Sequence, residues 1–356
     1  MTAQLIPRDE AELSEMIRAT HGPLAVRGGG TRGRAPQGPA ISTTALTGIT
    51  LYEPGALTLV VAAGTPVAEI EATLAAEGQR LAFEVPDLRG VLVRAGTSTI
   101  GGVVAENASG PRRVAVGAAR DFCLGVRFVD GRGDVVRNGG RVMKNVTGYD
   151  LVKLMSGSRG QLGVLTEVAL KVLPRPEIEL TLALSGLSVD QAVAAMSAAL
   201  GSPFEVTGAA HLPGQGTFLR IEGFEGSVAY RAGRLRALLA PWGEAREVPS
   251  AWAAIRDVAP LGGRQGDLWR ISTRPSLAAG LIARIGADEV MLDWGGALIW
   301  VLTPQGTDLR AKLGDLSGHA TCLRGTPPDP APPESPHLAE LTKGLRQAFD
   351  PRGIFA

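Results

Sequence analysis

The feature that most constrains the fold of this chain is a triplet of glycines in the segment "PLAVRGGGTRGR", directly after a short apolar run. Glycine tolerates positive φ and has no side chain, so successive backbone N–H groups in such a loop can form a nest for an anion. The same residues also suit a tight surface turn. This loop therefore predicts either a phosphate-binding nest or a plain turn.

The residues after the triplet exclude one common kind of phosphate site. In a Rossmann fold, the glycine loop leads directly into a helix whose N-terminus faces the phosphate. Here the following stretch, "GRAPQGPAIS", is too rich in proline and glycine to begin a helix. Any anion at this loop must be held by the backbone of the loop itself.

A second glycine-rich element, "TSTIGGVVAENASGPRR", has the same character as the first. Three consecutive hydroxyl side chains precede its glycine pair, and two arginines end it. Backbone that is free of side-chain bulk, beside hydroxyl and guanidinium groups, suits close approach to a phosphate. The two elements together are candidates for one anion site.

Composition narrows the class of protein. About 45% of the residues are apolar and the formal net charge is +1, which allows a sizeable core and gives no bias towards nucleic acid. The two cysteines lie far apart, so neither a disulfide framework nor a cysteine metal cluster is expected. No segment has the length of a signal peptide or of a membrane span. We expect a cytoplasmic protein that neither spans a membrane nor binds nucleic acid.

The first half of the chain predicts several short elements. A helix is expected over residues 9–19, with Asp9 as its cap, and a strand over residues 57–64. Thr65 is expected to cap the next helix, which Gly78 ends.

Further along, a hairpin is expected to turn at residues 130–133. The strand at residues 164–173 has two largely apolar faces, which predicts an interior position in a sheet.

From residue 177 the pattern changes to strands and helices in a repeating order. A helix begins at the capping box formed by Ser188 and Gln191. Two successive β-α-β-β-α units predict an α+β domain built from two ferredoxin-like halves. A proline-rich segment, residues 325–336, then leads to a terminal helix.

Taken in order, these motifs resemble the FAD-binding domain of the vanillyl-alcohol oxidase and p-cresol methylhydroxylase (PCMH) superfamily. Nearly the whole chain is similar to one family within it, the FAD-binding E subunits of bacterial glycolate oxidases. The resemblance is carried by "RGGGTR", "EPGALTLVVAAGT", "LAFEVPD", "STIGGVVAENASGPRR", "ARDFCLGVRFVDGRG", "VMKNVTGYDLVKLMSGSRGQLGVLTEVALKVLPRP", "LWRIS", "LDWGGA", "GHAT" and "AFDPRGIF".

The resemblance implies an α+β protein in three parts. It implies a PCMH-type two-part FAD-binding domain at residues 1–176 and a ferredoxin-like α+β domain of the cap or substrate type at residues 177–324. Residues 325–356 would form the proline-rich linker and a C-terminal helix that returns to the FAD domain.

The resemblance also assigns cofactor contacts. The residues that would cradle the FAD pyrophosphate are Arg27, Gly28, Gly29, Gly30, Thr31 and Arg32. Those that would wrap the phosphates and the ribityl chain are Thr97, Ser98, Thr99, Ile100, Gly101 and Gly102. Those that would lie against the flavin or the adenine are Pro86, Gly110 and Val164, the last through its backbone.

Some relatives tether the flavin covalently through a histidine in or near the first loop. Here Thr31 follows the glycines, and His21 is the only histidine of residues 1–176. The resemblance therefore implies a non-covalent FAD.

The resemblance further implies partners and an activity. The chain would work with a catalytic FAD subunit and an iron–sulfur subunit that passes electrons towards a membrane quinone pool. The complex would oxidise glycolate, a small 2-hydroxy acid, to glyoxylate, and it would place the chain in the cytoplasm or peripherally at the inner membrane.

Candidates for catalysis are weaker. The four histidines are not paired at a metal-ligand spacing, so no metal site is expected. The related catalytic subunits carry a histidine cluster that this chain lacks, which argues against substrate oxidation by this chain alone. The candidates for a carboxylate site near the flavin are Arg256, Arg270, His319 and Arg324. Structural ion pairs in the second domain are the alternative for these residues.

Other charged residues leave alternatives open. Arg112, Arg113 and Arg120 form either a solvated basic loop or a charge-stabilising group at FAD or a partner. Lys144 is a candidate cation beside reduced flavin. Three functions remain open at this point: the E subunit, a self-sufficient dehydrogenase of another 2-hydroxy acid, and a non-catalytic scaffold.

Overall fold

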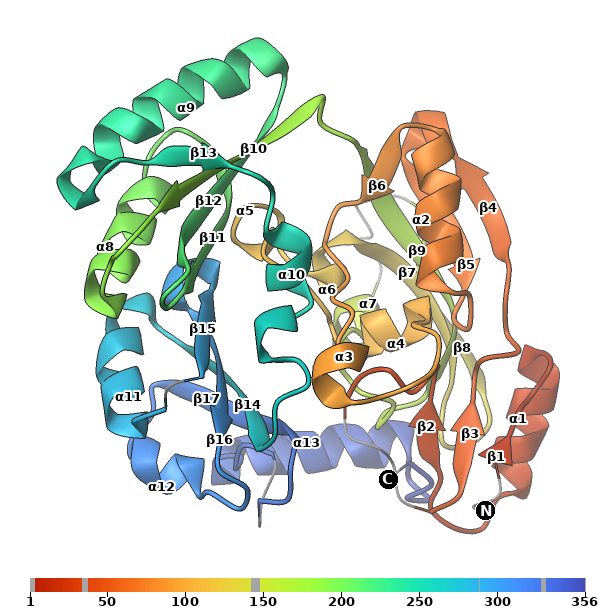
Figure 1. Ribbon diagram of the computed structural model, residues 1–356. Helices are drawn as coiled ribbons and strands as arrows, with labels where there is room; N and C mark the ends of the chain where they lie inside the picture. The colour runs from red at the N-terminus through yellow and green to blue at the C-terminus, as the bar shows by residue number, and fades with distance from the viewer. Residues whose placement is uncertain (1–3, 34–37, 142–147, 288, 328–330, 356) are drawn as a thin grey trace.

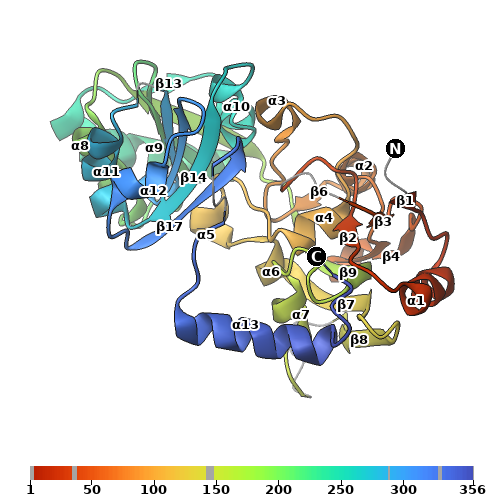
Figure 2. The same ribbon diagram turned by 90° about the horizontal axis from the view of Figure 1, so that it is seen from below.

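A computed structural model describes residues 4–33, 38–141, 148–287, 289–327 and 331–355 (Figure 1). The chain forms two bodies side by side, one from the N-terminal half and one from the C-terminal half. A long C-terminal helix runs below both of them (Figure 2).

The N-terminal body contains two sheets. A three-stranded parallel sheet has the order β1 (Gln4–Leu5), β3 (Ala40–Ser42), β2 (Ala25–Arg27). An antiparallel sheet has the order β4 (Ile49–Glu53), β5 (Thr58–Ala62), β9 (Val164–Pro174), β7 (Cys123–Val129), β8 (Val135–Gly139), and β6 (Gln79–Leu81) also pairs with β9. Strand β9 is therefore interior, as its two apolar faces predict.

Seven helices of the described residues accompany these sheets. They are α1 (Glu10–Ala19), α2 (Val67–Ala76), α3 (Arg89–Leu92), α4 (Ile100–Ala105), α5 (Arg113–Val116), α6 (Ala119–Phe122) and α7 (Leu151–Met155). Residues of α2, α4, α6 and α7 share one apolar core with the antiparallel sheet, and α1 belongs to a smaller core with β2 and β3.

The C-terminal body is one eight-stranded antiparallel sheet. Its order is β13 (Arg246–Val248), β10 (Ile178–Leu184), β12 (Gly216–Gly223), β11 (Val206–Leu212), β15 (Val290–Asp293), β16 (Leu298–Thr303), β14 (Asp267–Thr273), β17 (Gly318–Arg324). The order in the first half mirrors the order in the second, and β11 and β15 meet at the centre.

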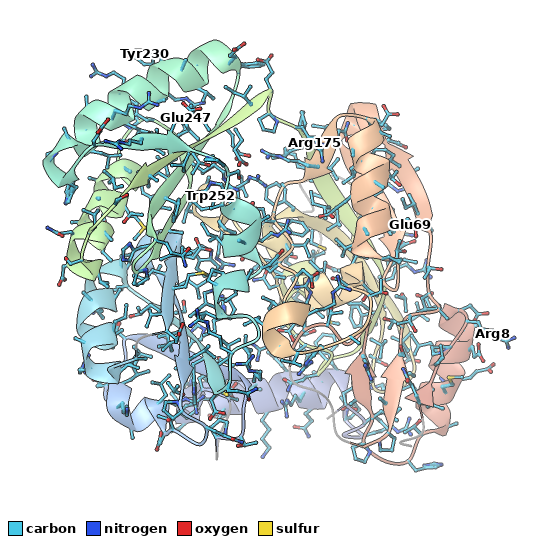
Figure 3. The ribbon with its side chains drawn as sticks, in the orientation of Figure 1. Arg8, Glu69, Arg175, Tyr230, Glu247 and Trp252 are labelled. Atoms are coloured by element: carbon cyan, nitrogen blue, oxygen red, sulfur yellow. The ribbon has the colours of Figure 1, made fainter. Side chains whose placement is uncertain are left out.

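The two faces of this sheet have different neighbours. The outer face is covered by α8 (Val189–Leu200), α9 (Glu225–Leu239), α11 (Ala278–Ile285) and α12 (Leu309–Leu313). The inner face is turned to the N-terminal body and packs against α10 (Trp252–Arg256) and residues of α3. Figure 3 shows Trp252 between the sheet and the N-terminal body, whereas Tyr230 projects outward from α9.

The C-terminal helix α13 (Pro336–Phe349) ends at the N-terminal body. The carboxylate of Asp350 accepts hydrogen bonds from the backbone of Ile354 and Phe355. Leu24 in turn donates its N–H to the carbonyl of Ile354 at 2.6 Å. These contacts fasten the end of the chain beside β2, the strand that leads into the first glycine loop.

Several local predictions agree with these elements, and one is wrong. Asp9 caps α1, and Ser188 and Gln191 form the capping box of α8. Thr65 does not cap α2, because α2 begins after Pro66 and the Thr65 hydroxyl accepts a hydrogen bond from Gly48 instead. The second glycine-rich element also differs from the first in containing a helix, α4.

Candidate cofactor site

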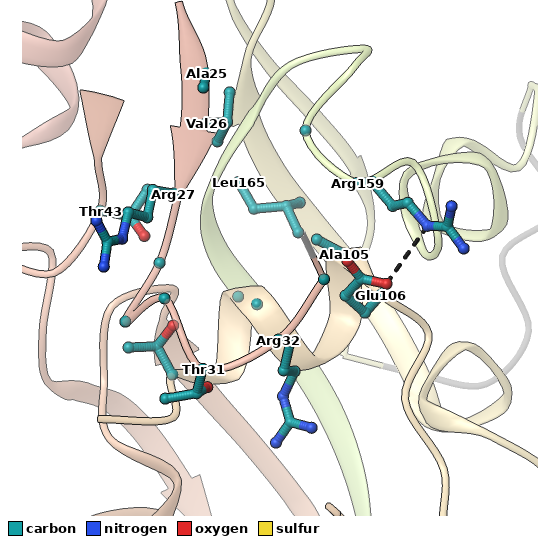
Figure 4. Close-up of a pocket in the computed structure, with 18 of the residues that line it drawn as sticks. Ala25, Val26, Arg27, Thr31, Arg32, Thr43, Ala105, Glu106, Arg159 and Leu165 are labelled. Carbon is teal, nitrogen blue, oxygen red and sulfur yellow. Dashed lines mark ion pairs between the residues drawn. The ribbon is translucent and has the colours of Figure 1, made fainter. Parts of the chain in front are cut away.

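A cavity of about 690 Å³ lies where the two glycine-rich elements meet. Its walls come from the loop after β2, the start of α4, the loop before β9 and strand β17. Figure 4 shows the first loop and α4 on two sides of it. A volume of several hundred Å³ is in the range of cofactor sites. The lining residues are 25–33, Thr43, 93–95, Thr99, Gly101, Gly102, Ala105, Glu106, 158–161, Gly163, Leu165, 321–323 and Ala331.

The first two glycines of the triplet allow the two loops to touch each other. A Cβ at Gly28 would lie 2.5 Å from the Thr99 hydroxyl, and one at Gly29 would overlap the carbonyl of Thr97. Gly30 has φ +72°, a conformation that favours glycine. These glycines therefore bring protein backbone against protein backbone, which a sequence pattern cannot distinguish from approach to a ligand.

The first backbone N–H groups of the second loop donate hydrogen bonds to other parts of the protein. The N–H groups of Ile100 and Gly101 donate to the carbonyls of Thr65 and Ala63. Gly101 also packs against Ala63, since a Cβ there would lie 2.7 Å from that side chain. Gly102 differs, because a Cβ at this position would meet only the Thr99 hydroxyl, at 3.5 Å. Gly102 is thus the glycine of this loop whose open side is not filled by protein.

Three buried polar atoms along the cavity have no hydrogen-bond partner. They are Nε of Arg32, Oγ1 of Thr99 and Oγ of Ser158, and the described residues contain only three further atoms of this kind. A buried polar group without a partner is destabilising and rare in proteins, so a cluster of them indicates a ligand.

Arg32 gives the cavity a positive charge. Its guanidinium donates to Ser98 Oγ at 2.8 Å, and none of the described carboxylates forms an ion pair with it. Burial lowers the pKa of Arg32 to about 10, although the charge of Glu106 acts in the opposite direction. Arg32 therefore stays protonated at neutral pH and attracts an anion.

Some residues of the cavity wall were not predicted from the sequence. Arg159 adopts φ +55° and its guanidinium forms an ion pair with Glu106 at 3.4 Å (Figure 4). Val93 adopts φ +53° at the cavity edge and is 74% exposed, which is unusual for a β-branched residue. The segment of Arg159 is glycine-punctuated in the sequence, whereas nothing in the sequence of β17 indicates that Thr321 faces this cavity.

The structure brings together part of the predicted cofactor set. The members that line the cavity are Arg27, Gly28, Gly29, Gly30, Thr31, Arg32, Thr99, Gly101 and Gly102. The members outside the lining are Pro86, Thr97, Ser98, Ile100, Gly110 and Val164.

Several of the outside residues have a clear structural position. Ile100 and Val164 are fully buried in apolar cores, although both neighbours of Val164 line the cavity. A Cβ at Gly110 would lie 2.8 Å from the Glu84 side chain of the same body and 3.1 Å from the Arg256 side chain of the C-terminal body, so Gly110 lies where the two bodies meet.

The four catalytic candidates are not gathered into one cluster by direct contacts. Arg256 forms an ion pair with Asp257 at 2.8 Å, and Arg324 donates to the carbonyls of Val91, Arg264 and Gly266. Arg270 and His319 lie on the adjacent strands β14 and β17. Burial and the charge of Arg270 lower the pKa of His319, which is therefore neutral at pH 7.

The three arginines of the basic loop are likewise not gathered into one cluster. Arg112 is buried between the carboxylates of Glu222 and Glu84 and joins the two bodies instead of facing the cavity. Arg113 stacks on the indole of Trp294 at 4.9 Å. The carbonyl of Arg120 accepts a hydrogen bond from Lys153. Lys144 lies outside the described residues.

The described residues contain neither a metal-binding group nor a membrane-spanning helix. No group of three or more histidine, cysteine, aspartate or glutamate side chains there is placed to hold a metal ion. No described helix has the length and apolar character needed to cross a bilayer.

The cavity therefore fits FAD on the evidence of its own residues. Unpartnered polar atoms, an arginine without a carboxylate and an open glycine face lie together along one cavity. The pyrophosphate of a dinucleotide needs several donors and no side-chain bulk. The fold and the cavity define the chain as an FAD-binding protein, and the FAD binding domain family matches residues 2–139.

Comparison with known proteins defines the family more closely. The chain is 36% identical over 338 residues to glycolate oxidase subunit GlcE of Escherichia coli strain K12, covering 94% of this chain and 91% of that protein. The chain thus belongs to the GlcE family of FAD-dependent oxidoreductase subunits.

More distant relatives match the chain in part or in fold. Glycolate oxidase subunit GlcD of Bacillus subtilis strain 168 is 42% identical over 100 residues, which are 28% of this chain and 21% of that protein. D-2-hydroxyglutarate dehydrogenase of Xanthomonas citri pv. viticola is 35% identical over 37% of this chain and 27% of that protein. The structure of alkyldihydroxyacetonephosphate synthase has a TM-score of 0.70 at 14% identity, covering 99% of this chain and 76% of that one, which indicates a shared fold.

Proposed function

We propose that this chain is the FAD-carrying E subunit of a glycolate oxidase complex. The observation behind this cofactor position is Arg32, a partly buried cation whose Nε lacks an acceptor and which lines the same cavity as the open face of Gly102. Arg32, Thr99 and Ser158 bind the pyrophosphate and the adjoining ribityl chain. Thr321 of β17 forms part of the same wall and would hold the flavin at that end of the cavity.

The bound FAD supplies a hydride acceptor. The protein residues bind it, orient it and exclude water between the two bodies. We infer a dissociable FAD, because His21 is exposed and does not line the cavity.

The domain division is part of the same proposal. Residues 1–176 form the PCMH-type FAD domain, residues 177–324 the ferredoxin-like domain, and residues 325–356 the linker and returning helix. The separate apolar cores of the two bodies and the mirrored strand order of the second support this division.

The partners are a catalytic FAD subunit and an iron–sulfur subunit, with glycolate as the substrate of the complex. The subunit names of the relatives in Escherichia coli and Bacillus subtilis support such a complex. We place the chain in the cytoplasm, with peripheral contact to the inner membrane through the complex.

The first experiment records the visible spectrum of the purified chain before and after anaerobic addition of glycolate or D-lactate. The E-subunit function predicts a yellow protein. Rapid bleaching by either acid would favour a self-sufficient dehydrogenase. A colourless protein that takes up no FAD would instead identify a scaffold.

The second experiment tests the position of the cofactor. Gly29→Val forces the first loop away from Thr97 and is expected to abolish FAD binding while the C-terminal body stays folded. Gly102→Ala fits the apoprotein and improves helix propensity, so it is expected to weaken FAD binding without lowering stability.

Gly90→Ala, at an exposed glycine of α3 with open space around it, is the matched control for both variants. Wild-type FAD affinity in Gly102→Ala would show that the cofactor does not pass this glycine.

A further inference from the structure

Arg270 lies on the face of the eight-stranded sheet that is turned to the FAD domain. Successive strand residues point to opposite faces. Trp269 and Ile271 belong to the outer core under the helices, whereas Leu268 belongs to the inner core. Arg270 therefore points inward with Leu268, and its partner in register on β17 is Thr321. Because Thr321 lines the cavity, Arg270 lies one strand from the cavity wall.

Arg270 is partly buried and forms no ion pair with an acidic side chain among the described residues, unlike the two buried arginines of this domain. Arg220 forms an ion pair with Glu84 at 2.8 Å, and Arg231 forms one with Glu205 at 3.0 Å. Arg270 instead stacks on Trp294 at 5.2 Å from the ring centroid.

Two further cations face the same place. Arg113, from the FAD domain, lies 4.9 Å from the centroid of the same indole. Burial, together with the charges of Arg113 and Arg159, lowers the pKa of Arg270 to about 10. Glu106 is paired with Arg159, and burial raises the pKa of Asp293 to about 7, so these two acids do not fully balance the charges of Arg270 and Arg113.

Trp294 is fixed from both sides. Its Nε1 donates to the carbonyl of Gly110 in the FAD domain at 3.1 Å, and its backbone N–H donates to Asp293 at 2.7 Å. Its φ of +53° is unusual for an aromatic residue, and such backbone conformations concentrate at ligand sites. The indole thus holds the two guanidinium groups in place across the domain boundary.

We propose that Arg270, with Arg113 beside it on Trp294, binds the carboxylate of a small organic acid at the flavin end of the cavity. This inference rests on the proposed function, which places flavin next to β17 and provides a 2-hydroxy acid. A planar guanidinium recognises a carboxylate through two parallel hydrogen bonds. The flavin of this subunit then has its own acid-binding site and is more than a structural group.

The inference predicts that the wild-type protein, loaded with FAD, binds oxalate with a measurable heat and a change in the flavin spectrum. Arg270→Gln is expected to weaken oxalate binding about 10- to 100-fold, as for the loss of a hydrogen-bonded charge. Arg270→Lys keeps the charge and loses the fork, so it is expected to recover part of the affinity. FAD content is expected to stay unchanged in both variants.

Arg234→Gln, at an exposed arginine of α9 on the outer layer, is the control and is expected to bind oxalate like the wild type. Inorganic phosphate is titrated in parallel and is expected to bind more weakly than oxalate. Three results would overturn the proposal: no heat with wild type, equal oxalate affinity in Arg270→Gln, or tighter binding of phosphate.

Loss of FAD from Arg270→Gln would also overturn it, since Arg270 would then serve the cofactor. The FAD content of the wild type is measured first and tests the proposed function by itself. Calorimetry with oxalate needs no flavin colour, so the two ideas can fail independently.

Discussion

Two groups of arginines, one buried and one partly buried, lie along the boundary between the two bodies, and they differ in their partners. In one group, Arg112 pairs with Glu222 at 2.9 Å and Arg220 pairs with Glu84 at 2.8 Å. In the other group, Arg32 and Arg270 have no carboxylate among the described residues.

The difference separates structural charge from functional charge. A buried cation is tolerated when a carboxylate and hydrogen bonds accompany it, and removing one partner is strongly destabilising. A buried cation without a carboxylate lowers the stability of the folded protein, and a bound anion removes this destabilisation. The paired group therefore holds the two bodies together, and the unpaired group marks where an anion is expected.

The largest effect is expected when the paired group is broken. Arg220→Met leaves Glu84 buried without its main partner, so the free energy of unfolding is expected to fall by about 3–5 kcal/mol. Urea unfolding followed by tryptophan fluorescence measures this change. The control is Arg246→Met, which breaks an exposed pair with Glu244 and is expected to change nothing measurable.

An arginine-to-methionine substitution in the unpaired group is expected to change the affinity for the ligand instead of the stability of the protein. Arg32→Met is expected to weaken FAD binding about 10- to 100-fold, since a charged hydrogen bond to phosphate is lost. The apoprotein is expected to be as stable as the wild type or more so, because a buried unpaired charge disappears. A destabilised apoprotein with normal FAD affinity would place Arg32 in the structural group.

A fall in pH is expected to weaken the ion pairs of the paired group. Burial by itself would raise the pKa of Glu222, but hydrogen bonds and charge from Arg112, Arg220 and Arg80 hold it at about 2, below the ordinary 4.5. A depressed folded-state pKa contributes stability above pH 4.5 that is lost as the pH falls towards 2. Unfolding free energies measured across this range are expected to decline, and to decline less steeply in Glu222→Gln.

The smallest effect is expected for Asp293, whose pKa is shifted in the opposite direction from that of Glu222. Burial raises its pKa from 3.8 to about 7, so its contribution is favourable below pH 3.8 and is lost as the pH rises through 7. Asp293→Asn keeps an acceptor for Trp294 and cannot ionise. The variant is expected to gain stability over the wild type at pH 8 compared with pH 5, and an equal pH dependence of the two would contradict this.

The sequence was sufficient for features that depend on near neighbours. The caps of α1 and α8 and the interior position of β9 all follow from residues within one element. The order of the motifs also identified the family and its FAD cofactor, because the spacing of glycines within each loop can be read directly from the sequence.

Tertiary structure alone decided the rest of the site. Gly28 and Gly29 suggested approach to a ligand, yet their missing side chains make room for Thr99 and Thr97. Arg112 and Arg270 look alike in sequence, but one meets the carboxylates of Glu84 and Glu222 and the other meets an indole. The partner of such a charge can lie more than a hundred positions away, as Glu222 does from Arg112, and only folding brings the two within a few ångströms.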